Sequence, residues 1–222
     1  MIRVVLADDD ALIRAGVRAV LATDPGIDVV AEAADGRGAV DLVQRHRPEV
    51  AILDIRMPGT DGLAATAEIR RTVPGTGVVV LTTFGEDDYI LRALGGGASG
   101  FLVKSGAPEE LLAGVRAVAD GAAYLSPRVA ARVVAHLASS GAGERADRRG
   151  SAREQVAGLT DRERQVLTLL GAGLSNGQVA RRLGLVEGTV KAHVSAILAR
   201  LGVPNRAAAA VVAHEAGIID EQ

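Results

Sequence analysis

The fold is decided by the stretch Val50-Ala51-Ile52-Leu53-Asp54-Ile55-Arg56-Met57-Pro58. It begins as a short apolar run and stops at a carboxylate, and the proline then turns the chain because its φ is fixed. Such a run, bounded by turn formers, predicts a fully buried strand of the parallel type. Asp54 therefore lies at the carboxyl end of a strand, where open α/β sheets place their chemistry. Taken alone, Asp54 is equally consistent with a cap on the next element.

Apolar runs alternate with amphipathic segments through the first half of the chain. Short connections with proline or glycine separate them, and five such repeats predict a doubly wound parallel sheet. The expected strands are Val4–Ala7, Ile27–Ala31, Val50–Leu53, Val78–Leu81 and Phe101–Val103, and the expected helices are roughly Leu12–Ala22, Gly38–Arg45, Leu63–Arg71, Asp87–Leu94 and Pro108–Asp120.

Polar side chains follow four of these strands. The first strand ends in Asp8-Asp9-Asp10 and the third in Asp54, while Thr82-Thr83 and Lys104 follow the fourth and fifth. These side chains should converge at one edge of the sheet. Clustered carboxylates repel one another and need a cation, and oxygen ligands suit Mg²⁺. A carboxylate beside magnesium, a hydroxyl and a lysine is suited to accept a phosphoryl group. A run of acids is more often a solvated loop, but four coinciding strand ends argue against that reading.

Composition narrows the class of protein. The chain has 222 residues, 48% of them apolar, and no cysteine, which excludes a disulfide framework and a thiolate zinc site. Its start shows no signal-peptide pattern, and no segment approaches the ~18 apolar residues that span a bilayer. We therefore expect a cytoplasmic protein with no membrane partner.

Charge is distributed unevenly along the chain. Residues 1–125 carry 12 Lys and Arg against 18 Asp and Glu, whereas residues 126–222 carry 13 against 9. This asymmetry suggests an acidic domain followed by one that faces nucleic acid. The two lysines, Lys104 and Lys191, stand out among 25 basic residues.

Between the halves, Ser126 and Pro127 predict the start of a helix that reaches about Leu137. Residues 139–153 are rich in Ser, Gly, Ala and Arg, which predicts a flexible connection whose arginines are solvated rather than phosphate-binding. The expected domains are 1–122, a linker helix and flexible linker over 123–157, and 158–222.

The second half predicts four helices. Thr160 with Glu163, and Ser175 with Gln178, have the spacing of capping boxes. A third helix, about 187–201, presents Val190, Val194, Ile197, Leu198 and Leu201 as its core face, and a fourth, alanine-rich helix follows Asn205. A short helix, a glycine turn and a longer helix with a small polar face form a helix-turn-helix. Residues 159–206 carry seven basic against three acidic side chains, which favours phosphate contact.

Two sets of motifs resemble known families. V-L-A-D-D-D, L-D-I-R-M-P-G-T-D-G-L, L-T-T-F and G-A-S-G-F-L-V-K resemble a response-regulator receiver domain, and L-T-D-R-E-R-Q-V-L…G-L-S-N…V-A-R-R-L…T-V-K-A-H-V resembles a LuxR-type DNA-binding domain. Together they resemble the NarL/FixJ subfamily. This implies an α/β fold, a five-stranded doubly wound receiver, followed by a small all-α helix-turn-helix domain.

The resemblance also implies site residues. Asp54 would accept the phosphoryl group, and Asp8, Asp9, Asp54 and the backbone carbonyl of Arg56 would hold Mg²⁺. Thr82 would hydrogen-bond the phosphoryl group, Lys104 would pair with it, and Phe101 would switch with Thr82. In the recognition helix, Lys191, Ala192 and Ser195 would face the major groove, with Thr189, His193 and Arg200 near the DNA backbone.

Two departures from the family pattern bear on these sites. Asp10 adds a third carboxylate beside the metal acids. Val186 stands where a Ser or Thr cap is usual, and a lost cap costs ~1 kcal/mol. Because Ala192 and Ser195 are small, DNA shape is expected to contribute to specificity.

We therefore expect a transcription regulator, not an enzyme. A sensor histidine kinase would phosphorylate Asp54, and a homodimer would then bind double-stranded DNA, with residues 207–214 as its dimer surface and RNA polymerase as a further candidate partner. One alternative makes the receiver a phosphorylation-independent dimerisation module, but the intact acids, Thr82 and Lys104 speak against it.

Two enzyme classes are also disfavoured. An aspartyl phosphatase would need a carboxylate at the position of Arg56, and a dinucleotide-binding enzyme would need G-x-G-x-x-G after the first strand.

Overall fold

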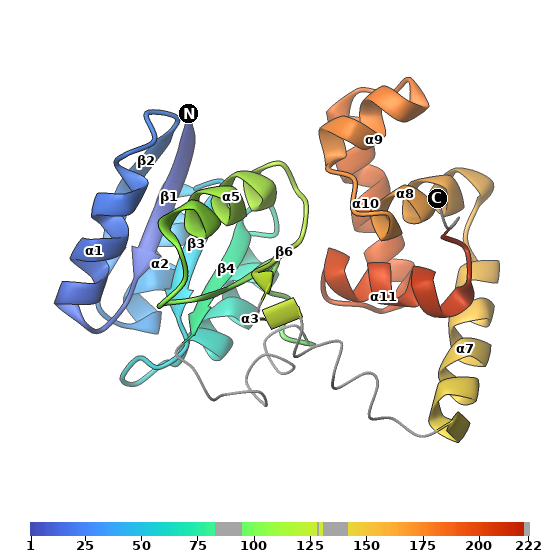
Figure 1. The fold of residues 1–222 in the computed structure, drawn as a ribbon, viewed down its shortest axis with the longest axis horizontal. Coiled ribbons are helices and arrows are strands. Elements are labelled where there is room, and N and C mark those ends of the chain that lie inside the picture. The colour runs from blue at the N-terminus through green and yellow to red at the C-terminus, as the bar shows by residue number, and fades with distance from the viewer. Residues whose placement is uncertain (83–94, 128, 131–141, 220–222) are drawn as a thin grey trace. The chain divides into compact units, whose positions relative to one another are not determined.

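A computed structural model describes residues 1–82, 95–127, 129–130 and 142–219. The chain divides into two compact units (Figure 1): the sheet unit, Met1–Ala119 with Tyr124–Arg132, and the helical unit, Asp120–Ala123 with Val133–Gln222. In these described parts, no single helix is long and apolar enough to cross a bilayer, and the pair that reaches the length together is bent by 67°.

The sheet unit is built on parallel strands in the order β2-β1-β3-β4-β5-β6. The predicted doubly wound parallel sheet is confirmed with its five expected strands, and a short sixth strand extends it beyond β5. The sixth strand has two residues, which pair with Gly100 and Phe101 and are too few to produce a periodic sequence signal. The strands are β1 (Ile2–Ala7), β2 (Ile27–Ala33), β3 (Val50–Asp54), β4 (Gly77–Thr82), β5 (Gly100–Val103) and β6 (Tyr124–Leu125).

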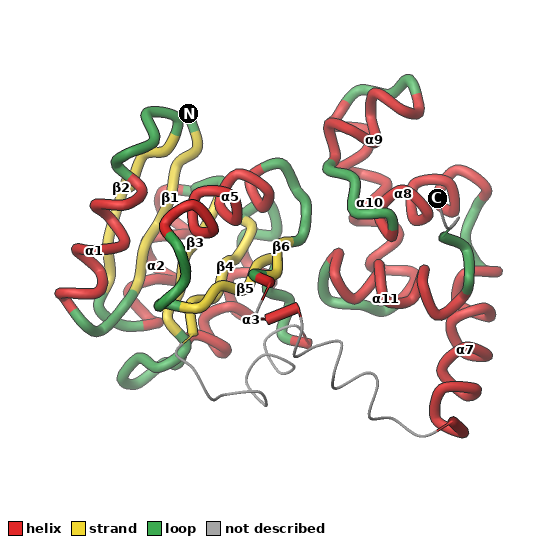
Figure 2. Tube along the Cα trace, viewed as in Figure 1, coloured by secondary structure: helices red, strands yellow, loops and turns green. Residues whose placement is uncertain are grey.

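Helices cover both faces of this sheet (Figure 2), α1 beside α5 and α2 beside α3. Asp10, Asp35 and Asp61 accept hydrogen bonds from backbone N–H groups of the first turns of α1, α2 and α3. These capping hydrogen bonds therefore fix the residue at which each of the three helices begins. The expected helix Asp87–Leu94 lies outside the described residues. The helices are α1 (Ala11–Leu21), α2 (Gly36–His46), α3 (Gly62–Thr72) and α5 (Pro108–Ala119).

Strand β3 is buried along its whole length, from Val50 to Asp54. It lies between β1 and β4, with helices on both faces, so each of its side chains meets protein. This explains why its sequence is an unbroken apolar run and not an alternating one. The same burial fixes Asp54 at the sheet edge.

The helical unit contains α7 (Ala142–Ala157), α8 (Asp161–Gly171), α9 (Asn176–Leu183), α10 (Glu187–Leu201) and α11 (Arg206–Ala216). Both predicted capping boxes are confirmed, at Thr160 and at Ser175. Gly184 and Gly202 end α9 and α10 in the left-handed conformation, which glycine adopts without steric cost. The predicted core face of α10 is confirmed, with Val190, Ile197 and Leu201 buried.

Helix α7 corrects the expected flexible connection. Residues 142–153, predicted as part of a flexible linker, are helical. Ala152 and Val156 are buried in the core that α8, α10 and α11 share. Gln155 Nε2 also donates to the Leu201 carbonyl at 3.3 Å, and Arg148 pairs with Glu215 at 3.5 Å. The prediction failed because α7 is held by a narrow stripe of small residues, which composition alone cannot distinguish from a loop.

We predict that Val156→Ala lowers the free energy of unfolding of the helical unit by about 1–3 kcal/mol, because it removes buried methyl groups and leaves a cavity. Chemical denaturation followed by far-UV circular dichroism measures this change. Arg153→Ala, on the exposed side of the same helix, should stay within about 0.5 kcal/mol of wild type. Equal, small effects of both substitutions would mean that α7 does not belong to this core.

Candidate functional site

Three carboxylates meet at the carboxyl edge of the sheet. Asp8 follows β1 and Asp54 ends β3, two strands that are neighbours with Ala7 opposite Leu53. One oxygen from each of Asp8, Asp9 and Asp54 lies within 4.8 Å of the others. Asp8 and Asp54 are buried, whereas Asp9 is exposed. The predicted convergence of these acids is therefore observed, with a donor set made of oxygens alone.

Lys104 joins the two buried acids. Its Nζ lies 2.8 Å from Asp8 Oδ2 and 3.0 Å from Asp54 Oδ2. Burial raises the pKa of Asp54, and Lys104 acts against that increase. Burial alone would lower the pKa of Lys104, but its hydrogen bonds to the two acids outweigh this and raise it. The lysine is thus held as a cation between two carboxylates.

Further contacts fix the loop that carries Asp8 and Asp9. Asp10 is used as the cap of α1 and accepts from Leu12 N and Ile13 N, at 2.8 and 3.2 Å. Arg14, which the sequence analysis did not identify, donates from Nη1 to the Asp8 carbonyl at 2.6 Å. Arg14 also pairs with Glu32 of β2 at 3.3 Å. The position of Arg14 four residues after Asp10, one helical turn away, places it near the acids and could have identified it from the sequence. Its hydrogen bond, however, goes to a backbone carbonyl and not to a carboxylate.

Thr82 and Phe101 lie on the adjacent strands β4 and β5, and both are buried. Thr82 pairs with Val103, and Phe101 pairs with Val80, so the two residues are offset along the sheet. The backbone N–H of Lys104 donates to the Thr82 carbonyl at 2.8 Å, which brings Thr82 to the acid edge. The side chain of Arg56 is exposed on the loop after β3, and Thr83 lies outside the described residues.

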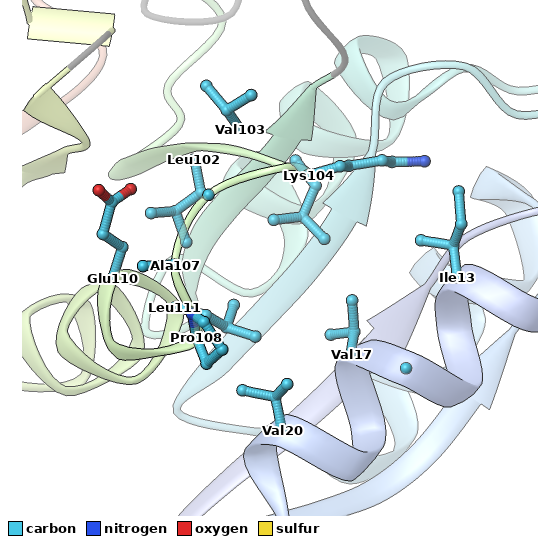
Figure 3. A pocket seen from close by; sticks show the side chains of 13 residues that line it. Ile13, Val17, Val20, Leu102, Val103, Lys104, Ala107, Pro108, Glu110 and Leu111 are labelled. Atoms are coloured by element: carbon cyan, nitrogen blue, oxygen red, sulfur yellow. The ribbon is translucent and has the colours of Figure 1, made fainter.

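A cleft of about 260 Å³ lies between α1 and the segment from β5 to α5 (Figure 3). Its walls are largely apolar and include Val17 of α1 and Leu111 of α5, with Leu81 and Leu102 of the sheet. Lys104 also contributes to the lining. The residue that bridges the acids is therefore shared with the cleft.

Helix α10 presents its predicted polar face to solvent. Lys191, Ala192 and Ser195 are exposed, while Thr189 and His193 are partly buried. Ser195 Oγ donates to the Lys191 carbonyl at 3.1 Å, and Lys191 Nζ lies 3.3 Å from Glu187. Among the six predicted contact residues, Lys191 and Arg200 are the two cations.

The two ends of α10 are held in different ways. Val186 precedes the helix without a side-chain capping bond and is 72% exposed, as its sequence suggested. At the other end, Arg200 pairs with the buried Glu163 at 3.2 Å. Hydrogen bonds from Thr160 lower the pKa of Glu163, and Arg200 lowers it further. Arg200 therefore ties the end of α10 to the start of α8.

Comparison with known proteins agrees with this geometry. Residues 4–116 match the family described as the response regulator receiver domain, and residues 157–213 match the luxR family of bacterial regulatory proteins. The DNA-binding transcriptional activator DevR/DosR of Mycobacterium tuberculosis is 40% identical over 217 residues, covering 97% of this chain and 95% of that protein. The nitrate/nitrite response regulator protein NarL of Escherichia coli is 34% identical, over 96% of this chain and 94% of that protein.

Among solved structures, the response regulator ChrA of a heme-sensing two-component system has 35% sequence identity and a TM-score of 0.54, over 98% of each chain. The two family matches fall on the sheet unit and the helical unit respectively. The chain therefore belongs to the two-component response regulators that join a receiver domain to a LuxR-type helix-turn-helix domain and regulate transcription.

Proposed function

We propose that phosphorylation of Asp54 by a sensor histidine kinase controls DNA binding by this transcription regulator. The observation that carries this proposal is the pair of contacts from Lys104 to Asp8 and Asp54, at 2.8 and 3.0 Å. A buried carboxylate at a strand end, beside a second acid and a cation, has the chemistry of a phosphoryl acceptor. Because its target is genomic DNA, the proposed site of action is the cytoplasm.

The acid cluster suits Mg²⁺. Asp8, Asp9 and Asp54 offer carboxylate oxygens close enough to share one ion, and the backbone carbonyl of Arg56 is the further proposed ligand. Hard oxygen donors of this kind favour magnesium over softer metals. When bound, the ion would offset negative charge on the transferring phosphoryl group.

The residues of the site then have distinct roles. An Asp54 oxygen forms a bond to phosphorus as the bond from phosphorus to the histidine nitrogen of the kinase breaks, and the electron pair of that bond returns to the nitrogen. Lys104 exchanges its contact with the Asp54 carboxylate for one with the phosphoryl oxygens. The Thr82 hydroxyl donates to the same oxygens. Since Phe101 lies on the neighbouring strand, we propose that it repacks when Thr82 moves.

The helical unit is proposed to bind duplex DNA through α10. Lys191, Ala192 and Ser195 on the exposed face would enter the major groove, with Thr189, His193 and Arg200 nearer the backbone. Arg200 already pairs with Glu163 in the structure, so its contact with the DNA backbone would either keep or replace that ion pair. RNA polymerase is a further proposed partner at the promoter.

We also propose that the phosphorylated chain forms a homodimer through α11. Ala207, Ala210 and Val211 on this helix remain partly exposed, whereas Ala209 and Ala213 are buried within the helical unit. Small residues allow two helices to approach closely. Two-fold pairing of this surface would match two DNA half-sites.

Incubation with acetyl phosphate and Mg²⁺ tests the proposal directly. We expect one added phosphoryl group by intact mass and a shift to dimer by light scattering. Asp54→Asn should show neither change, because it lacks the attacking carboxylate. A wild-type chain that takes up no phosphate, is already dimeric and binds DNA would overturn the switch and favour a phosphorylation-independent dimerisation module.

Substitution of Lys104 tests the charge balance of the site. Lys104→Gln should lower the free energy of unfolding of the sheet unit by about 3–5 kcal/mol, because it leaves two buried carboxylates without their cation. Adding Asp54→Asn should recover part of that loss. Urea unfolding followed by far-UV circular dichroism gives both values, and Arg71→Gln, which breaks an exposed pair with Glu68, should have little effect. No recovery in the double variant would contradict the proposed charge coupling.

The DNA interface is tested by Lys191→Ala. We expect this substitution to weaken binding to a duplex selected from a random library by about 1–3 kcal/mol, since Lys191 is an exposed cation near the start of α10. Fluorescence anisotropy at several salt concentrations measures the loss. Arg37→Ala, an exposed arginine of the sheet unit, is the matched control and should bind as wild type does. Equal affinities of both variants would exclude Lys191 from the interface.

A further inference from the structure

Two glycines on different helices hold the loop that follows β3. This loop, residues 55–61, runs from Asp54 to the start of α3 and carries Arg56. Gly62 is the first residue of α3, and Gly36 is the first residue of α2. We infer that Gly36 and Gly62 are positioning residues, which set the backbone of Asp54 and its loop by direct contact. This inference rests on the proposed magnesium-dependent function of that site.

Gly62 packs directly against the acceptor residue. A Cβ built on Gly62 would lie 2.0 Å from the carbonyl oxygen of Asp54, 2.9 Å from its carbonyl carbon and 3.0 Å from Ile55 Cα. Cβ atoms essentially never lie within 3.0 Å of another non-bonded atom, so a methyl group here requires the backbone to move. Gly62 N also donates to the Ile55 carbonyl at 2.9 Å. The start of α3 therefore sets the position of the peptide between Asp54 and Ile55.

Gly36 holds the other end of the loop. A Cβ on this residue would lie 2.2 Å from the Thr60 carbonyl oxygen and 3.1 Å from Thr60 Cγ2. Gly36 N donates to the same Thr60 carbonyl at 3.2 Å. Since Thr60 immediately precedes the cap of α3, this contact transmits the position of α2 to the loop.

Backbone conformation does not explain these glycines. Neither Gly36 nor Gly62 has a positive φ, so other residues could adopt their dihedral angles. Gly59, in the middle of the same loop, shows the contrasting case, with a φ of 72° and no atom within 4 Å of its Cβ position. Gly59 is needed for the turn, whereas Gly36 and Gly62 are needed for close approach.

The same pair of residues, a capping aspartate followed by a glycine, occurs at the starts of α2 and α3. Asp35 caps α2 by accepting from Gly38 N at 2.7 Å, and Asp61 caps α3 by accepting from Ala64 N at 2.7 Å. A glycine follows each aspartate. The aspartate fixes where the helix begins, and the glycine lets that first turn touch the loop. Backbone packing at both ends of the loop therefore contributes to its position.

Displacement of this loop should weaken magnesium binding more than it weakens the fold. A Cβ on Gly62 would lie 2.0 Å from the Asp54 carbonyl oxygen, and relieving this clash to 3.0 Å requires the loop and the start of α3 to separate by about 1 Å. We expect Gly62→Ala to raise the dissociation constant for Mg²⁺ on the order of 10–100-fold, the range found when residues that orient metal ligands are replaced. Gly36→Ala should act in the same direction through Thr60.

The test uses full-length protein without phosphodonor and measures Mg²⁺ binding by isothermal titration calorimetry. Gly75→Ala is the matched control, because Gly75 has no atom within 4 Å of its Cβ position and no positive φ. We expect weaker Mg²⁺ binding in Gly62→Ala and Gly36→Ala with folded far-UV spectra, unchanged binding in Gly75→Ala, and phosphate uptake that recovers at high Mg²⁺. Unchanged Mg²⁺ affinity in both variants would overturn the inference.

Amide spectra of metal-free protein give a second readout. Gly62→Ala should displace the signals of Asp54 and Ile55, and Gly36→Ala those of Thr60 and Asp61, beyond any change in Gly75→Ala. If the wild type binds no Mg²⁺, the metal part of the proposed function fails, while these displacements still support positioning. If Gly62→Ala does not fold, Gly36→Ala decides the outcome. Shifts no larger than those of the control would mean that the glycines do not position the loop.

Discussion

The contact of one ammonium group with two buried carboxylates organises the sheet unit. Asp8, Asp54 and Lys104 come from the ends of β1, β3 and β5, and each is carried there by a buried apolar strand. Two carboxylates at this distance without a cation would repel each other in a medium of low dielectric constant. The sheet can therefore bury Asp54 because Lys104 reaches it, and the acid becomes part of the stable edge of the sheet.

The sequence predicted the parts of the site that depend on strand order. An unbroken apolar run ending in Asp54 indicated a buried parallel strand, and parallel strands bring their carboxyl ends together, so Asp8, Asp54 and Lys104 were predictable without coordinates. Contacts with a distant backbone carbonyl could not be predicted from the sequence. Arg14 donates to the Asp8 carbonyl, and Gly62 touches that of Asp54. Nothing in the residue types says which backbone oxygen lies nearby.

Two parts of the fold escaped prediction for another reason. Strand β6 is too short to show a period, and α7 has few large apolar residues. Both are stabilised by what they pack against, β5 in one case and α11 in the other. Local sequence predicts secondary structure poorly wherever tertiary contacts, and not intrinsic propensity, supply most of the free energy that stabilises the helix or strand. The capped helices α8 and α9 show the opposite case, since their start signals lie within four residues.

Strand order also has a consequence during synthesis. Ribosomes release Asp8 and Asp54 well before Lys104, yet β5 must pair with β4 before the lysine can reach the acids. A nascent chain that ends before β5 lacks the ammonium group that lies between the two carboxylates in the folded protein. If Asp54 accepts a phosphoryl group, as proposed, its site is completed only late in translation, once β5 and Lys104 have been made.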